Sequence, residues 1–201
     1  MELEGWNERY RSGDRAKDWE AAPNPLVVQT CAGMPPGRAL DLACGSGRNS
    51  IWLAERGWKV TAVDGAASAI EILRQRASEL GVTVDARVAD LEKDEFEIEE
   101  SCWDLVAMCF YLQRSLFERA KRGVQPGGLV LAIVHIVESG EEATEHRLMP
   151  GELKQYFSDC EVLHYHEGKS RDAAHKRPVA EIVARPAARE ERRRSSLKLP
   201  R

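Results

Sequence analysis

The chain has 201 residues, 43% of them hydrophobic and 31% charged, which fits one soluble globular domain with a sizeable core. A formal net charge of -4 gives no overall attraction to nucleic acid or to an anionic membrane, and no apolar run approaches the roughly 20 residues of a membrane helix. Five scattered cysteines without Cys-x-x-Cys spacing, and an acidic N-terminus unlike a signal peptide, predict reduced thiols, no metal site and a cytoplasmic location.

The N-terminal segment, residues 1–25, is rich in aromatic and charged side chains and does not have the pattern of a core element. Trp6, Arg9 and Tyr10 are spaced so that a short helix would bring them together. Such a segment can form a lid over a ligand cleft, contribute Tyr10 and Trp19 to a substrate pocket, or pack its aromatics on the domain as a surface arm.

A glycine-rich turn follows the first predicted strand, at 38–43, in the run Asp41-Leu42-Ala43-Cys44-Gly45-Ser46-Gly47. Gly45 and Gly47 have no Cβ, so a ligand can approach the backbone closely. A helix from about 47 to 56 should follow, and its first N–H groups can receive an anionic group such as a carboxylate. Ser50 stands where a dinucleotide fingerprint has its third glycine, and the Gly-Lys-Ser/Thr of nucleotide hydrolases is absent.

Further acids follow the next two predicted strands. Asp64 comes directly after the apolar strand at 58–63, and Asp90 follows the strand at 82–88, beyond a helix at 66–80. An acid at the tip of a second parallel strand is placed to accept hydrogen bonds from the hydroxyls of a ribose. Asp41, beside the glycine turn, is placed to accept from an ammonium group.

These motifs resemble those of the class I S-adenosylmethionine-dependent methyltransferases: Asp-Leu-Ala-Cys-Gly-Ser-Gly is similar to their first motif and Val-Asp-Gly at 63–65 to their second. Trp-Asn-Glu-Arg-Tyr, with Trp19 and Pro-Asn-Pro-Leu, resembles the N-terminal segment of the tellurite-resistance and thiopurine type, in which it covers the cofactor.

The resemblance implies S-adenosylmethionine as cofactor, with its methionine end held at Asp41, its ribose at Asp64 and its adenine at Asp90 and the backbone of Leu91. An alternative for Asp90 is a helix cap. The full set of implied cofactor contacts is Asp41, Ala43, Cys44, Gly45, Gly47, Asn49, Asp64, Gly65, Asp90, Leu91 and Cys109.

Two further candidates lie where later strands should end. Tyr111 follows the apolar strand at 103–109 and is a substrate-side candidate, with a half-buried packing tyrosine as the alternative. His135 ends the strand at 129–135, after a Pro-Gly-Gly turn. It can act as a general base, or it can be a loop histidine bonded to backbone.

The alternation of strands and helices predicts an α/β fold: a doubly wound, mostly parallel sheet with helices on both faces. The resemblance implies seven strands in the order 3-2-1-4-5-7-6, the seventh antiparallel. The methyltransferase domain is expected over 26–187 and a disordered basic tail over 188–201. The remaining elements are expected at 26–32, 113–123 and 150–157 as helices and at 160–167 and 178–184 as strands.

The resulting hypothesis is methyl transfer to a small molecule, such as a thiol or a chalcogen oxyanion. One alternative is a nicotinamide-dependent oxidoreductase, which Ser50 disfavours. Another is a methyltransferase of RNA or protein. The target-base motif Asn/Asp-Pro-Pro-Tyr/Phe is absent where Cys109-Phe110-Tyr111-Leu112 stands, which disfavours nucleic acid. A non-catalytic binding protein that keeps the cleft is the last alternative.

Overall fold

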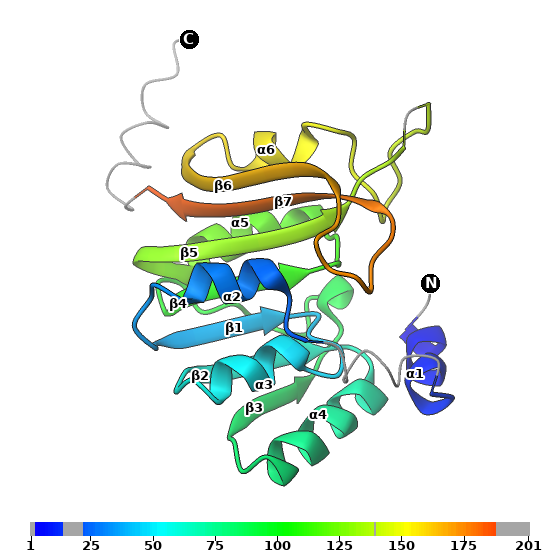
Figure 1. The fold of residues 1–201 in the computed structure, drawn as a ribbon, viewed down its shortest axis with the longest axis vertical. Coiled ribbons are helices and arrows are strands. Elements are labelled where there is room, and N and C mark those ends of the chain that lie inside the picture. Colours follow the sequence, from blue (N-terminus) through cyan, green and yellow to red (C-terminus); the bar gives the residue numbers. More distant parts are fainter. Residues whose placement is uncertain (1–2, 14–21, 139, 188–201) are drawn as a thin grey trace.

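Seven strands form one sheet in the order β3-β2-β1-β4-β5-β7-β6 in the computed structural model, which describes residues 3–13, 22–138 and 140–187 (Figure 1). The strands are β1 Arg38–Leu42, β2 Lys59–Asp64, β3 Val84–Val88, β4 Trp103–Cys109, β5 Val124–His135, β6 Cys160–Lys169 and β7 Pro178–Pro186. The helices are α1 Leu3–Arg11, α2 Pro25–Cys31, α3 Arg48–Ala54, α4 Ala67–Glu79, α5 Arg114–Gly123 and α6 Glu152–Tyr156, with a 3-10 turn, η2, at Leu91–Lys93.

Strands β3, β2, β1, β4 and β5 pair in parallel, and β7 pairs antiparallel with both β5 and β6. This is the predicted doubly wound sheet with the predicted strand order. The central strands are mostly apolar and buried, as expected for strands that have helices on both faces of the sheet. β3 is an outer strand of the sheet, and most of its residues are exposed or half-buried.

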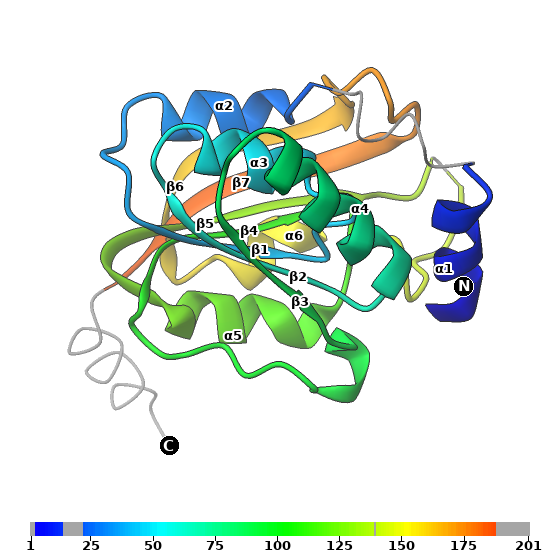
Figure 2. The same ribbon diagram turned by 90° about the horizontal axis from the view of Figure 1, so that it is seen from below.

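Two helical layers enclose the sheet (Figure 2). Helices α2, α3 and α4 pack on one face, where Leu26, Ile51 and Leu73 belong to one buried cluster. Helices α5 and α6 pack on the other, where Phe117 and Phe157 belong to a second cluster. Burial of these side chains, at about 1.5–3 kcal/mol each, is what fixes the layers on the sheet.

Strand β5 starts at Val124, ahead of the expected start at residue 129, because Val124 already pairs with Trp103. The ladder then shifts register between Trp103 and Leu105, and the Pro-Gly-Gly segment forms the irregularity. A Cβ on Gly128 would lie 2.7 Å from the Trp103 carbonyl oxygen, so the strands can approach here only at a glycine.

The carboxyl ends of the parallel strands meet at one edge of the sheet, and two segments lie beside that edge in Figure 1. One is α1, and the other is the connection between β6 and β7, here called the β6–β7 loop and defined as residues 170–177. In an open parallel sheet this edge is where ligands bind. The expected tail at 188–201 lies outside the part of the chain that the structure describes.

Candidate functional site

A cavity of about 1070 Å³ opens at the carboxyl edge of the sheet. Its walls come from the glycine-rich turn, the ends of β2, β4 and β5, helix α1 and the β6–β7 loop. The structure brings to it, of the predicted cofactor contacts, Asp41, Ala43, Cys44, Gly45, Asn49, Asp64, Gly65, Asp90, Leu91 and Cys109, and of the predicted substrate-side residues, Tyr10, Tyr111 and His135.

The two glycines of the turn have different neighbours. Gly45 has a φ of +55°, and a Cβ there would lie 2.6 Å from the Tyr10 hydroxyl, so α1 approaches the turn closely. Gly47 has a φ of +80° and does not line the cavity; a Cβ there would run into the side chain of Leu73 on α4. The missing Cβ of Gly45 therefore lets Tyr10 of α1 approach the turn, and the missing Cβ of Gly47 lets α4 pack against the start of α3.

Asp41, in β1, is 2% exposed and points toward α3. The Ser50 hydroxyl donates a hydrogen bond of 2.6 Å to one of its carboxylate oxygens. Burial raises the pKa of Asp41 to about 6, against that hydrogen bond and the charge of Arg48. Ser50, which replaces the third glycine of a dinucleotide fingerprint, thus orients a buried carboxylate at the cavity wall.

Asp64 connects the end of β2 to the glycine-rich turn. One carboxylate oxygen accepts from the Gly45 backbone N–H and the other from that of Ala66, each at 2.8 Å. Burial raises the pKa of Asp64, and the two N–H groups oppose the shift. Each oxygen keeps a second lone pair, so the carboxylate can still accept from ribose hydroxyls.

Asp90 caps the η2 turn, as the cap alternative proposed. It accepts from the Glu92 backbone N–H at 3.0 Å and pairs with Lys93 at 3.1 Å. Burial disfavours its charged form, but the Lys93 and Glu92 contacts outweigh burial and lower the pKa of Asp90. The next residue, Leu91, is buried, and its carbonyl accepts from the Gln113 amide at 3.0 Å. Asp90 therefore caps the η2 turn and lines the cavity at the same time.

Helix α1 brings Trp6, Arg9 and Tyr10 together, as their spacing predicted, and all three line the cavity. The helix is held on α4 by Asn7, whose carbonyl accepts from the Ser68 hydroxyl at 2.9 Å and whose side-chain oxygen accepts from the Ser68 N–H at 3.2 Å. Trp19, the other predicted aromatic of this segment, lies outside the described residues.

The end of the cavity around His135, here called the His135 end, is aromatic. Phe110 follows β4 with a φ of +62°, a conformation that costs a non-glycine residue about 1–2 kcal/mol. Its ring stacks on His175 of the β6–β7 loop, with centroids 3.3 Å apart and planes within 4°. His135 lies 5.5 Å from Phe110 and 5.4 Å from His175, between centroids.

The His135 imidazole is suited to remain neutral. Burial lowers its pKa, and the charges of Arg177 and Arg147 lower it further. A backbone hydrogen bond to Pro178, of the kind that the loop alternative expected, opposes this lowering, and Nδ1 is buried without a hydrogen-bond partner among the described residues. Tyr111 has a half-buried ring that packs against the core, and its hydroxyl donates to the Gln113 side chain at 3.0 Å.

Basic side chains surround this end: Lys176 and Arg177 line the cavity from the β6–β7 loop, and His146 lines it from the loop after β5. The Cys44 and Cys109 thiols at the cavity wall are held in the protonated, weakly nucleophilic form, because burial raises the pKa of both. Across 3–13, 22–138 and 140–187, no group of three or more His, Cys, Asp or Glu side chains is arranged to hold a metal ion. In the same ranges no helix is long and apolar enough to cross a membrane.

Sequence reasoning missed several cavity residues, among them Arg48, Phe110 as a stacking platform, His175, Lys176 and Arg177. All of these except Phe110 belong to the start of α3 or to the β6–β7 loop, whose sequence indicates only a charged connection. Nothing in the spacing of the chain signals that His175 returns to Phe110.

Comparison with known proteins gives a consistent family. The family model described as "Tellurite resistance protein TehB" matches residues 18–177. A curated relative from Haemophilus influenzae, named "Probable S-adenosyl-L-methionine-dependent methyltransferase TehB", is 24% identical over 148 residues, which cover 70% of this chain and 52% of that protein. The chain thus spans about half the length of the first curated relatives it matches.

Solved structures agree on the fold. The crystal structure of TehB from Haemophilus influenzae superposes with a TM-score of 0.70 at 24% identity, covering 81% of this chain and 62% of that one. A geranyl diphosphate C-methyltransferase from Streptomyces coelicolor A3(2), crystallised with Mg²⁺, geranyl diphosphate and S-adenosyl-L-homocysteine, gives a TM-score of 0.64 at 14% identity, covering 81% and 79%.

Proposed function

The chain belongs to the TehB family of class I S-adenosylmethionine-dependent methyltransferases, and we propose that it transfers the methyl group of S-adenosylmethionine to a small anionic acceptor. One observation carries the proposal: three carboxylates, Asp41, Asp64 and Asp90, line a common cavity with a glycine-rich turn between the first two.

The cofactor end offers a partner for each part of S-adenosylmethionine. Asp41 receives the ammonium group of the methionine moiety. Asp64 accepts from the ribose hydroxyls with its free lone pairs. Asp90 accepts from the adenine amino group, next to the buried Leu91. A helix over the turn, α1, then covers the cofactor and keeps water from it.

The chemistry demands little from side chains. When bound, S-adenosylmethionine would supply the methyl group. A lone pair of the acceptor would form the new bond to the methyl carbon as the carbon–sulfur bond broke, and the two electrons of the broken bond would stay on sulfur in a neutral thioether. The main contribution of the protein is to hold the two reactants in line in a closed, drier pocket. Neither an oxidant nor a reductant is consumed.

The His135 end of the cavity, which we propose as the acceptor end, favours an anion that needs no deprotonation. Lys176 and Arg177 line the cavity beside His135, whose lowered pKa keeps its imidazole neutral. An alcohol or amine would gain from a basic group, and a buried histidine with a lowered pKa is a weak base. A soft oxyanion fits this environment, and the matching family model is named for resistance to one such ion, tellurite.

The test is a panel of acceptors with methyl-labelled S-adenosylmethionine. Selenite and tellurite, a thiolate, a neutral phenol and an amine are incubated separately with the protein, and the methylated products are identified by mass spectrometry. We expect turnover of the oxyanions and weaker turnover of the thiolate. Methylation of the phenol or the amine alone would refute the anionic acceptor, and S-adenosylhomocysteine formation with none of them would refute the small-molecule class.

A further inference from the structure

Three segments that are far apart in the chain meet at Asp172, in the β6–β7 loop. They are the approach to α2 at Asn24, the first turn of α3 at Arg48, and the loop itself. Asp172 is 6% exposed, and the Arg48 side chain that pairs with it is 13% exposed. A buried pair of opposite charges is costly to assemble unless its remaining polar atoms are also bonded.

The carboxylate of Asp172 uses both oxygens. One accepts from the Arg48 guanidinium and, at 3.2 Å, from the Asn24 amide; the other accepts from the Ala174 backbone N–H at 3.0 Å. Burial disfavours the charge, but the Arg48 contact outweighs it and lowers the pKa of Asp172. The carboxylate is therefore ionised near neutral pH, with its charge directed at α3.

The same residue shapes the loop that follows it. The Asp172 N–H donates to the Ser170 hydroxyl at 3.1 Å, and its carbonyl accepts from the His175 N–H at 3.0 Å. The resulting turn at 172–175 delivers the His175 ring onto Phe110. The Arg48 guanidinium carbon lies over the Phe110 ring, 6.0 Å from its centroid.

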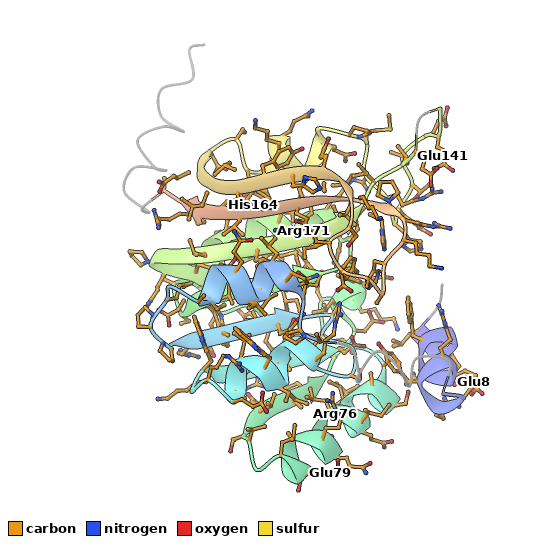
Figure 3. All side chains as sticks on the ribbon, viewed as in Figure 1. Glu8, Arg76, Glu79, Glu141, His164 and Arg171 are labelled. Carbon is orange, nitrogen blue, oxygen red and sulfur yellow. The ribbon has the colours of Figure 1, made fainter. Side chains whose placement is uncertain are left out.

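The preceding residue fixes the other flank of the loop. Arg171 pairs at 2.9 Å with Glu181, a buried carboxylate of β7, and reaches Gln29 on α2 at 3.1 Å. Figure 3 shows Arg171 and His164 beside β7, where His164 lies 3.4 Å from the same Glu181 oxygen. Arg171 thus ties the loop to the sheet and α2, whereas Asp172 ties it to the cofactor-binding side.

We propose that Asp172 is a positioning residue for methyl transfer. By pairing with Arg48 at the start of α3, Asp172 fixes the position of the β6–β7 loop. The loop in turn fixes the aromatic wall of the acceptor end relative to the cofactor end. The effect of Asp172 on the acceptor rests on the proposed function. Its effect on the His175–Phe110 stack does not. The geometry predicts that loss of Asp172 moves the acceptor relative to the methyl group while the cofactor contacts at Asp41, Asp64 and Asp90 remain.

The experiment uses Asp172→Asn, which keeps the size of the side chain and removes its charge. The matched control is Asp159→Asn, which removes the charge of one of the two carboxylates paired with the buried Lys121, on the α6 side of the molecule and away from the cavity. For each protein we measure affinity for S-adenosylhomocysteine by calorimetry, kcat and KM for the acceptor, and the proton NMR resonance of the His175 ring, assigned with His175→Gln.

We expect Asp172→Asn to lower kcat/KM for the acceptor by about 10- to 100-fold, mainly through kcat, since displacement of a bound reactant by about 1 Å can cost that much in rate. Affinity for S-adenosylhomocysteine should change by less than about threefold, and the upfield shift that Phe110 imposes on His175 should disappear. Asp159→Asn should retain both kcat/KM and the His175 shift. Asp172→Glu, which keeps the charge for Arg48 but is too long to hold the 172–175 turn unchanged, should be intermediate and serves if the asparagine variant does not fold.

An unchanged His175 resonance and an unchanged kcat/KM in folded Asp172→Asn would overturn the proposal. So would an equal fall of activity in Asp172→Asn and Asp159→Asn that follows their melting temperatures, because this would indicate a structural role alone. Loss of the His175 shift in a protein whose wild type methylates no acceptor would refute the proposed function and leave the positioning of the loop by Asp172 standing.

Discussion

Asp41 should make cofactor binding depend on pH in a mildly acidic range. Burial raises the pKa of this carboxyl to about 6, so in the free protein it is neutral below that pH and ionised above it. Only the ionised form attracts the ammonium group of the cofactor. With a pKa near 6, roughly one molecule in eleven carries the charge at pH 5 and about ten in eleven at pH 7, so affinity should be about tenfold weaker at pH 5, or about 1.4 kcal/mol.

Calorimetric titration with S-adenosylhomocysteine between pH 5 and pH 7 measures this directly, because the amino group of the ligand stays protonated throughout that range. Asp41→Asn should bind more weakly at pH 7 and lose most of the pH dependence. Burial also raises the pKa of Asp64, so a shallow slope should persist in this variant. A wild-type affinity that is flat from pH 5 to pH 7, or a slope that Asp41→Asn leaves intact, would refute the assignment of Asp41 to the ammonium group.

Three further changes should have distinct results. Gly47→Ala puts a Cβ on a residue with left-handed backbone and makes it clash with α4, so the free energy of unfolding should fall by about 2–4 kcal/mol and the melting temperature by roughly 5–15 °C. The control Gly81→Ala, at a φ of +66° in open space, should show only the smaller cost of backbone strain. Equal losses of stability in the two variants would contradict the packing role of Gly47. Asp64→Ala should weaken S-adenosylhomocysteine binding about 10- to 100-fold by calorimetry, and unchanged affinity would remove the ribose assignment. Arg177→Ala should raise KM about tenfold for an anionic acceptor with no change in S-adenosylhomocysteine affinity, and an equal effect on a neutral acceptor would contradict the anion-binding role.

The α/β class, most of the strands and helices, and the meeting of three acids at one cavity could be predicted from sequence because local patterns determine them, whereas the strand order was implied by the family resemblance. Continuous apolar runs indicate buried parallel strands, and the acids at 41, 64 and 90 come at or just beyond strand ends, which meet at one edge of such a sheet. Gly47 shows the limit of this reasoning. The motif predicted a cofactor contact, whereas the structure places it against Leu73, because a glycine can admit either a ligand or a neighbouring helix.

The acceptor end could be predicted only in part. Tyr111 and His135 follow apolar strands, so their positions at the cavity could be inferred. The pairing of Arg48 with Asp172 joins residues 124 positions apart, and no periodicity or motif encodes it. The return of His175 to Phe110 depends in the same way on where the β6–β7 loop packs, which is decided by tertiary contacts.

The central claim is that the cavity at Asp41, Asp64 and Asp90 holds S-adenosylmethionine. Its most direct test is calorimetric titration of the wild-type protein with S-adenosylhomocysteine and, separately, with NAD and NADPH. We predict saturable one-to-one binding of S-adenosylhomocysteine and no heat of binding with either nicotinamide. Saturable binding of a nicotinamide dinucleotide, with none of the thioether nucleoside, would contradict the claim.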